Sequence, residues 1–280
     1  MANIELDGLK FHYRQSGAGP DVVLVHAFTS NMAVWLFTDI VEKLAADFRV
    51  TMYDLRGHGN SARPESGYNS AVMAGDLKKL HQALELEPAL LVGHSYGGTI
   101  SMHAAVLYPE IVRGVILSDS YFPGLAEIEP NMLHADVWAD VRRVLAEADA
   151  HIGESVNFTE LFHAVAGLRP EQMEIIKQEL GAPGARWLAQ LGQLSETRSG
   201  DEMFEVAGLT AEKIASVGQP VFAFYDEHSP FMATCRYLEE HLSRCTVERV
   251  PGAKHVAILQ NSPVFVEMVQ RRLREMAGLT

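Results

Sequence analysis

Short apolar runs alternate with longer stretches of helical patterning along most of the chain. The helical stretches, such as residues 70–86 and 262–276, repeat apolar residues every three to four positions. Continuous apolar runs separated by helices predict a mostly parallel sheet that is covered by helices on both faces, which is the α/β class. The candidate strands are the runs at residues 22–25, 50–53, 89–92, 114–117, 221–225 and 246–250.

The N-terminal segment has a different pattern. Apolar and polar residues alternate over residues 3–15, on either side of the pair Asp7-Gly8. An Asp-Gly pair between two alternating segments is typical of a two-residue β-hairpin. We therefore expect two antiparallel strands at the start of the chain, which brings the predicted sheet to eight strands.

One long interval interrupts the alternation of strands and helices. Residues 122–217 have helical patterning and no convincing strand. Such an insertion either elaborates the packing of the core or forms a cap over the C-terminal edge of the sheet, where open α/β sheets bind their ligands. We favour the cap. It divides the chain into a core of residues 1–121 and 218–280 and a helical cap of residues 122–217.

Composition and charge narrow the classes of function. Hydrophobic residues make up 48% of the 280 residues and charged residues 21%, a balance that supports one large core and excludes intrinsic disorder. The 36 Asp and Glu outnumber the 23 Lys and Arg, which gives a formal net charge of −13. This charge has the wrong sign for attraction to phosphate backbones or anionic lipids, so we expect no nucleic-acid or membrane partner.

The location and the cofactors are also constrained. The N-terminus lacks the apolar segment of a signal peptide, and the only cysteines, Cys235 and Cys245, are too few for a disulfide framework. We therefore expect a soluble, cytoplasmic protein, and the sequence leaves its oligomeric state open. The 12 histidines are scattered and match no metal-binding spacing, and no glycine-rich phosphate motif occurs. We predict no metal and no cofactor.

The strongest local motif is Gly93-His94-Ser95-Tyr96-Gly97-Gly98, which follows an apolar run and precedes a helical stretch. A serine hydroxyl is a weak nucleophile that needs exposure, a base and donors for the oxyanion that forms. A sharp strand-to-helix turn exposes the side chain, and the following helix directs its N-terminal amides at the same point. We predict that Ser95 is a nucleophile; the alternative is an incidental serine in a glycine-rich turn.

At this motif the chain resembles the α/β-hydrolase family, and in particular its cap-bearing serine hydrolases. Residues 22–28 are similar to the family's third strand and oxyanion loop, and Asp54 to Ser61 to its Asp-x-Arg-Gly-His-Gly-x-Ser stretch. Residues 251–255 resemble the loop that bears the catalytic histidine. The resemblance implies the α/β-hydrolase fold, a mostly parallel eight-stranded sheet flanked by helices, with the helical cap inserted after the sixth strand.

The resemblance also implies roles for individual residues. His255 lies between the last strand and the last helix and would be the catalytic base. The oxyanion donors would be the backbone amides of Tyr96, after the nucleophile, and of Phe28, in the early loop. The family usually has His-Gly before that second donor, whereas this chain has His26-Ala27. Alanine disfavours positive φ, so the loop either adopts a conformation that alanine tolerates or is shifted.

The acid of the triad is ambiguous. The family usually places it after the seventh strand in a Gly-x-x-Asp turn, but here Asp226 stands at the glycine and Ser229 at the aspartate. Serine cannot stabilise an imidazolium as a carboxylate does. Either Asp226 or Glu227 reaches the histidine from a rearranged turn, or the acid has moved to the end of the sixth strand, as in some relatives. We favour Asp119, just past that strand; its alternative role is to cap the loop.

These residues predict acyl transfer through a covalent ester, in which Ser95 attacks a carbonyl and His255 moves the protons. A serine nucleophile argues against dehalogenase and epoxide hydrolase chemistry, for which relatives use aspartate. We predict a carboxylic ester hydrolase, an esterase or lactonase acting on a small-molecule ester or lactone, including a bulky or macrocyclic one. The alternatives are C–C bond hydrolysis, thioester hydrolysis or acyl transfer by the same triad, and non-catalytic ligand binding.

Four further residues are candidates for contact with the substrate. His26 and His94 lie beside the oxyanion loop and the nucleophile, and Phe122 and Trp138 belong to the apolar residues of the expected cap. The alternative for both histidines is a packing and hydrogen-bonding role in their loops. The alternative for the aromatic residues is packing between the helices of the cap.

Overall fold

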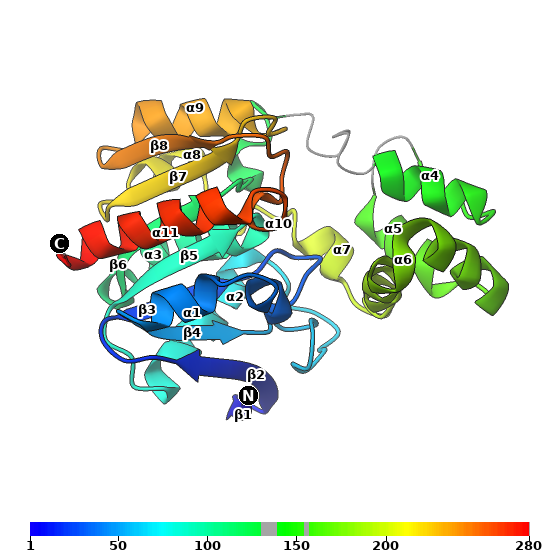
Figure 1. Cartoon of the computed structure of the whole chain (residues 1–280), viewed down its shortest axis with the longest axis horizontal. Helices are drawn as coiled ribbons and strands as arrows, with labels where there is room; N and C mark the ends of the chain where they lie inside the picture. Colours follow the sequence, from blue (N-terminus) through cyan, green and yellow to red (C-terminus); the bar gives the residue numbers. More distant parts are fainter. Residues whose placement is uncertain (130–138, 154–156, 280) are drawn as a thin grey trace.

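An eight-stranded sheet forms the centre of the molecule (Figure 1). The computed structural model describes residues 1–129, 139–153 and 157–279. The strand order is β1-β2-β4-β3-β5-β6-β7-β8; the β1/β2 and β2/β4 pairs are antiparallel and the others parallel. The predicted, mostly parallel eight-stranded sheet is therefore confirmed. The strands are β1 (Ala2–Leu6), β2 (Leu9–Ser16), β3 (Asp21–Val25), β4 (Arg49–Tyr53), β5 (Ala89–His94), β6 (Val112–Ser118), β7 (Val221–Asp226) and β8 (Cys245–Val250).

The N-terminal hairpin turns at the pair that its sequence indicates. Asp7 and Gly8 connect β1 to β2 with φ angles of 49° and 77°. A two-residue turn with both φ angles positive matches the twist of antiparallel strands, and aspartate and glycine are residues that adopt it at low cost. The hairpin prediction is confirmed.

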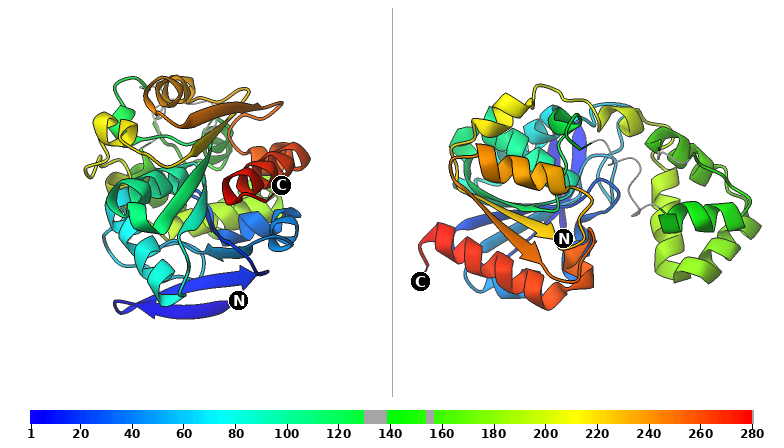
Figure 2. Two further views of the ribbon diagram at one scale, coloured as in Figure 1. Left: turned by 90° about the vertical axis from the view of Figure 1, so that its left-hand side faces the viewer. Right: turned by 90° about the horizontal axis from the view of Figure 1, so that it is seen from above.

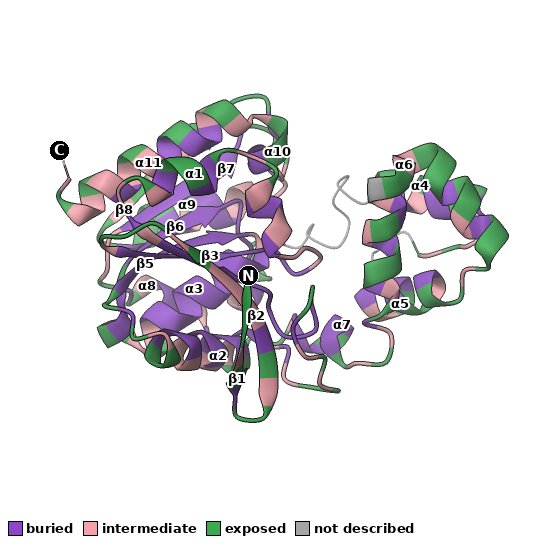
Figure 3. Cartoon of the chain, turned by 60° about the horizontal axis from the view of Figure 1, so that its bottom comes forward, coloured by how far each residue is buried: buried purple, intermediate pink, exposed green. Residues whose placement is uncertain are grey.

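Helices cover both faces of the sheet. Successive residues of a strand point to opposite faces, so each strand contributes side chains to both helical layers. Val23 and Val25 of β3 pack in one hydrophobic cluster with residues of α2 and α3, whereas Val22 and Leu24 pack in a second cluster with residues of α1 and α11. The two layers of helices on either side of the sheet are visible in Figure 2, and Figure 3 shows the central strands buried between them.

The helices expected at residues 70–86 and 262–276 begin and end close to the predicted positions, as α2 and α11. Within the described part of the chain, no helix is long and apolar enough to span a bilayer. The core helices are α1 (Ile40–Ala45), α2 (Ser70–Ala83), α3 (Tyr96–Leu107), α9 (Met232–His241), α10 (Ala257–Gln260) and α11 (Ser262–Ala277), with 3-10 turns η1 (Met32–Leu36), η2 (Pro109–Ile111) and η3 (Pro123–Leu125).

The segment between β6 and β7, hereafter the insertion, contains helices and no strand among its described residues. Three of its helices, α4, α5 and α6, gather beside the core, and α7 connects them to it (Figures 1 and 2). The long helix α6 changes direction at Gly181, whose φ of 71° lies outside the helical region. The helices of the insertion are α4 (Ala139–Glu147), α5 (Phe158–Ala166), α6 (Pro170–Gly192), α7 (Ser199–Glu202) and α8 (Ala211–Ala215).

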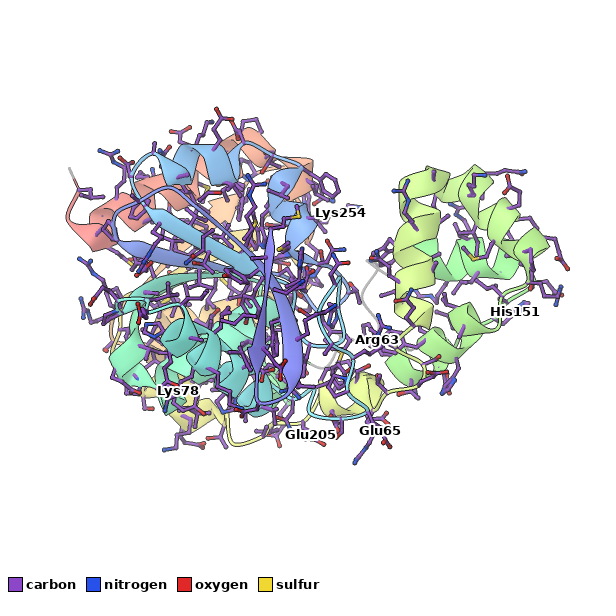
Figure 4. All side chains as sticks on the ribbon, turned by 90° about the horizontal axis from the view of Figure 1, so that it is seen from below. Arg63, Glu65, Lys78, His151, Glu205 and Lys254 are labelled. Atoms are coloured by element: carbon purple, nitrogen blue, oxygen red, sulfur yellow. The ribbon has the colours of Figure 1, made fainter. Side chains whose placement is uncertain are left out.

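Hydrogen bonds join the insertion to the loop that follows β4. The carboxylate of Glu202 in α7 accepts hydrogen bonds from the backbone amides of Gly67 and Tyr68, at 2.6 and 2.8 Å. Beside it, the backbone amide of Arg198 donates to the carbonyl oxygen of Glu65 at 2.8 Å. Glu65 is labelled at this junction in Figure 4. The loop after β4 thus anchors one end of the insertion.

A buried ion pair holds the same loop against α2. Nε and Nη2 of Arg56 each lie 2.6 Å from an oxygen of Asp76, and the two side chains are only 9% and 5% exposed. Burial raises the pKa of Asp76, and the hydrogen bonds from Arg56 oppose that rise. Both charges are therefore paired in an environment that would penalise either one alone.

We predict that Asp76→Ala lowers the free energy of unfolding by about 3 to 5 kcal/mol, because it leaves the Arg56 guanidinium buried and unpaired. Urea denaturation followed by circular dichroism measures the change. Asp140→Ala is the matched control, because the Arg143–Asp140 pair is 51% and 87% exposed and should contribute less than about 1 kcal/mol. An equal loss in the two variants would contradict a structural role for the buried pair.

Candidate active site

The predicted nucleophile, Ser95, lies at the sharp turn between β5 and α3. Its backbone has φ 53° and ψ −120°, a conformation that non-glycine residues rarely adopt. Two hydrogen bonds hold this strained turn: the Ser95 amide donates to the carbonyl oxygen of Ser118 at 2.8 Å, and the Gly98 amide donates to that of Ser95 at 2.9 Å. Strain maintained in this way is characteristic of functional sites. The half-buried Ser95 lines a cavity.

Two glycines allow the backbone to pack closely around this turn. A Cβ atom at Gly93 would lie 2.4 Å from the carbonyl oxygen of Gly97, and one at Gly97 would lie 2.1 Å from that of Val25. No side chain fits at such distances, so both positions require glycine. The end of β3 therefore packs directly against the first turn of α3, which brings the loop containing Phe28 next to the nucleophile.

His255 forms a hydrogen bond with Asp119, the acid that the sequence favours. Nδ1 of His255 lies 2.7 Å from Oδ2 of Asp119, and the other carboxylate oxygen accepts a hydrogen bond from the Asp226 amide at 3.1 Å. The Asp119 side chain is fully buried, whereas that of His255 is 17% exposed. Because a carboxylate only accepts, the histidine carries its proton on Nδ1 and leaves Nε2 free to accept another.

The two alternative acids, Asp226 and Glu227, make contacts that differ from those of Asp119. The carboxylate of Glu227 accepts a hydrogen bond from the Gly252 amide at 2.8 Å, so it holds the loop that carries His255. Asp226 is fully buried, and its carboxyl group lies near the backbone amide of Ala257. Burial and the neighbouring charge of Asp119 raise the pKa of Asp226 to about 7. In this geometry Asp119 is the carboxylate that is hydrogen-bonded to the histidine.

His94 supports the loop of the predicted base. Its Nε2 lies 2.8 Å from the backbone carbonyl oxygen of His255, to which it donates. Burial and the nearby His255 lower the pKa of His94 to about 4, so the imidazole is neutral at physiological pH. His94 also lines the cavity beside Ser95, as a substrate-contacting residue would.

His26 organises the loop after β3 instead of facing the cavity. The fully buried ring donates from Nδ1 to the carbonyl oxygen of Ala27 at 2.8 Å and accepts at Nε2 from the Leu55 amide at 3.0 Å. Burial lowers its pKa to about 4, in agreement with a neutral ring that both donates and accepts. Ala27 does not have a positive φ, so the loop takes a conformation that alanine tolerates.

Phe28 and Tyr96, the residues whose amides are the expected oxyanion donors, both line the cavity with Ser95. Their rings make an edge-to-face contact with centroids 5.6 Å apart. Tyr96 is the first residue of α3, so its N–H belongs to the amides at a helix N-terminus that have no partner within the helix. The Tyr96 hydroxyl donates to the carbonyl oxygen of Tyr68 at 2.8 Å, which fixes the side chain.

The cavity has a volume of about 900 Å³ and opens between the core and the insertion. This volume lies in the range of small-molecule sites. Aromatic and aliphatic side chains from both parts of the chain form most of its wall, and a smaller polar group occupies the rest. The apolar members include Phe28, Tyr121, Val141, Phe158, Trp187, Met203 and Phe231, and the polar ones Asn31, Asn60, Arg186 and Gln190.

Two of the expected substrate contacts do not line the cavity, and a third lies outside the described residues. Phe122 is fully buried and does not line the cavity, and the same holds for His26. The neighbouring Tyr121 lines the cavity instead of Phe122. Tyr121 stands two positions after Asp119, and this closeness to the end of β6 is the sequence signal that identifies it as a candidate for the cavity wall. Trp138 is in the range that the structure does not describe.

Trp187 links the insertion to the predicted oxyanion loop. Its indole N–H donates to the carbonyl oxygen of Thr29 at 2.6 Å. Nδ2 of Asn31 donates to Oε1 of Gln190 at 3.3 Å. Residues 187–190 of α6 are thus bonded to the segment directly after Phe28. The wall of the cavity and the loop beside the nucleophile are parts of one hydrogen-bonded arrangement.

Metal coordination finds no support in the described side chains. Among them, no group of three or more His, Cys, Asp or Glu residues lies close enough together to hold an ion.

We predict that Asp226→Asn stabilises the protein more at pH 8 than at pH 5. In the unfolded chain Asp226 ionises near its ordinary pKa of 3.8, whereas the folded chain keeps the proton up to about pH 7. The folded state therefore loses stability as the pH rises between these values. Asparagine has no such charge, so its advantage over the wild type should grow by roughly 2 to 3 kcal/mol between pH 5 and pH 8.

Urea denaturation at the two pH values measures this difference. Asp140→Asn, which changes an aspartate whose side chain is 87% exposed, is the control and should show no such dependence on pH. A constant difference between Asp226→Asn and the wild type would show that Asp226 is ionised throughout.

Comparison with known proteins agrees with the fold. A family model described as alpha/beta hydrolase fold matches residues 20–262. Among solved structures, an esterase from Rhodococcus superposes with a TM-score of 0.69 at 21% identity and covers 99% of this chain and 98% of that one. The enol-lactonase from Burkholderia xenovorans gives a TM-score of 0.68 at 20% identity and covers 97% and 99%. At these identities the structures show the fold alone.

Curated relatives carry several activities. The 2-(acetamidomethylene)succinate hydrolase of Mesorhizobium japonicum is 37% identical over 116 residues, which are 41% of this chain and 41% of that protein. The 2-hydroxymuconate semialdehyde hydrolase of a Pseudomonas strain is 31% identical over 188 residues, 65% of this chain and 66% of that protein. The acetyltransferase component of the acetoin cleaving system of Cupriavidus necator is 32% identical over 272 residues, 96% of this chain and 68% of that protein.

The match to the first of these relatives spans about two fifths of its length, so it carries less weight than the family model. That model covers most of the chain. The chain therefore belongs to the alpha/beta hydrolase fold family.

Proposed function

We propose that the protein is a serine hydrolase that cleaves a carboxylic ester or lactone through an acyl-enzyme. The observation that carries the proposal is the hydrogen bond from His255 to the buried Asp119, in the wall of the same cavity that Ser95 lines. Relatives named as hydrolases of 2-(acetamidomethylene)succinate and of 2-hydroxymuconate semialdehyde support hydrolysis as the reaction class.

Ser95, His255 and Asp119 divide the proposed chemistry between them. Nε2 of His255 accepts the hydroxyl proton while Oγ of Ser95 attacks the carbonyl carbon, and the carboxylate of Asp119 stabilises the imidazolium that forms. The amides of Tyr96 and Phe28 bind the negative oxygen of the tetrahedral intermediate. The imidazolium then protonates the departing alcohol oxygen, which leaves the acyl group on Ser95.

Water completes the cycle by the same steps. His255 accepts a proton from a water molecule as its oxygen attacks the acyl-enzyme, and the tetrahedral intermediate collapses to a carboxylic acid. The proton returns to Ser95, so the enzyme ends in its starting state. With a lactone, the alcohol and the acid remain parts of one product, because the bond that breaks closes a ring.

The insertion acts as a cap in this proposal. Val141, Phe158, Trp187 and Met203 from the insertion face the same cavity as Ser95, and their apolar surface suits the hydrocarbon part of a mid-sized ester. A serine at the nucleophile position argues against the epoxide chemistry of some relatives, for which the family uses aspartate.

We predict that the protein hydrolyses 4-nitrophenyl esters of short to medium acyl chains, and that Ser95→Ala abolishes this turnover. A fluorophosphonate probe should label the wild type at Ser95 and leave the variant unlabelled. Release of 4-nitrophenol and mass spectrometry of the labelled protein are the measurements. Absence of both turnover and labelling in the wild type would favour a ligand-binding protein on this fold.

Parallel assays with a thioester and a vinylogous diketone test the alternative chemistries of the same triad. The proposal requires that the oxygen ester have the highest kcat/KM of the three. A higher kcat/KM for the diketone would assign the protein to C–C bond hydrolysis, and a higher value for the thioester to thioester cleavage.

We predict that Asp119→Asn lowers kcat for the ester by about a thousandfold or more, because an amide cannot stabilise the imidazolium. Asp226→Asn is the matched control, since it changes a buried carboxyl at the end of the adjacent strand and should lower kcat less than about tenfold. Circular dichroism verifies that both variants are folded. Near-normal activity of Asp119→Asn together with a large loss in Asp226→Asn would reverse the assignment of the acid.

A further inference from the structure

The cavity contains one solvent-accessible charged side chain that the proposed chemistry does not use. Arg186 is exposed and is the only Lys or Arg among the described residues that line the cavity. The single acidic residue of the lining is Asp54, which is 2% exposed. Both oxygens of Asp54 accept backbone hydrogen bonds, from Met32 at 2.8 Å and from Asn60 at 2.9 Å. The accessible charge in the cavity is therefore positive, in a chain whose net charge is −13.

No carboxylate of the described residues neutralises this guanidinium. Two other basic side chains of α4 and α6 are paired at close range: Arg143 with Glu147 at 2.8 Å, and Lys177 with Glu174 at 3.2 Å. Acidic residues outnumber basic ones in this chain, 36 to 23, so partners for a basic residue are abundant. Arg186 makes no ion pair within the part of the chain that the structure describes, although it lies in the wall of a cavity.

The backbone of Arg186 is held in a fixed position relative to the predicted oxyanion loop. The next residue, Trp187, donates its indole N–H to the carbonyl oxygen of Thr29 at 2.6 Å, and Gln190 accepts from Asn31 at 3.3 Å. These bonds attach the turn of α6 that contains Arg186 to the segment following Phe28. A group bound by Arg186 would thus occupy the same cavity as Ser95, in a defined direction from it.

We propose that Arg186 binds a carboxylate of the substrate, so that the natural substrate is an ester or lactone with a free carboxylate elsewhere in the molecule. A guanidinium presents paired N–H donors that match the two oxygens of a carboxylate. The low-dielectric walls of an apolar cavity strengthen that attraction relative to open solvent. This inference rests on the proposed function, because it names the class of ester that the site prefers.

The test compares esters that differ only in one terminal charge. The 4-nitrophenyl monoesters of glutaric, adipic and suberic acids are assayed beside the 4-nitrophenyl esters of pentanoic, hexanoic and octanoic acids. In the wild type, at least one monoester should have a kcat/KM roughly tenfold above that of its neutral counterpart, mainly through a lower KM. Arg186→Gln should lower kcat/KM for the charged monoester to about that of its neutral counterpart and so remove this preference.

A control variant removes the same charge from the same helix. Lys177→Gln changes a side chain of α6 that is 52% exposed, paired with Glu174 and absent from the wall of the cavity. It should keep the preference for the charged esters. Equal kcat/KM values for charged and neutral esters at every chain length, or a preference that survives Arg186→Gln, would overturn the assignment of Arg186.

A binding measurement keeps the assignment testable if no ester is hydrolysed. The monoanilide of adipic acid and the anilide of hexanoic acid are titrated into the wild type and Arg186→Gln by isothermal calorimetry. The charged anilide should bind the wild type more tightly than the neutral one, and Arg186→Gln should bind the two alike. Hydrolysis without a charge preference would leave the proposed function standing and refute only the role of Arg186. A charge preference in binding without hydrolysis would support the role of Arg186 and refute the proposed function.

Discussion

The hydrogen bond between His255 and Asp119 is the interaction on which the rest of the site depends. Asp119 stands at the end of β6, where its buried carboxylate receives one donor from the histidine and one from the backbone of β7. The ring of His255 is fixed by this bond and its backbone by His94, the neighbour of Ser95. One buried negative charge therefore connects the ends of β5, β6 and β7 with the loop after β8.

The two neighbouring carboxyl groups differ because their hydrogen-bond donors differ. Asp119 accepts hydrogen bonds from an imidazole and from a backbone amide. Asp226 lies beside it, and burial and the charge of Asp119 raise its pKa to about 7, although the Ala257 amide and the nearby His255 oppose that rise. Two adjacent buried carboxylates repel each other, so the site has one anionic position. The donors decide which residue occupies it.

Much of the fold could be predicted, whereas the acid and the cavity wall required the structure. In the sequence, buried strands are recognised as apolar runs. The turn at Ser95 is recognised by its flanking glycines, which are required because the backbone packs too closely there for a side chain. Whether His255 bonds to Asp119 or to Asp226 depends on whether the loop after β8 lies closer to the end of β6 or to the end of β7. That distance is set by the tertiary structure and cannot be read from the local sequence. Phe122 and Tyr121 are both buried, and tertiary packing decides which of them lines the cavity, so the sequence named Phe122 and missed Tyr121.

The acidic composition of the chain and the positive charge in the cavity act over different distances. A net charge of −13 opposes binding to a polyanion, which meets the whole surface of the protein. At physiological ionic strength, salt screens exposed charges beyond about 8 Å, so a small ligand inside the cavity responds mainly to the groups that line it. There the carboxylate of Asp54 is bonded to backbone amides and the guanidinium of Arg186 is accessible. The net charge that opposes binding to a polyanion therefore does not oppose binding of a small anionic substrate.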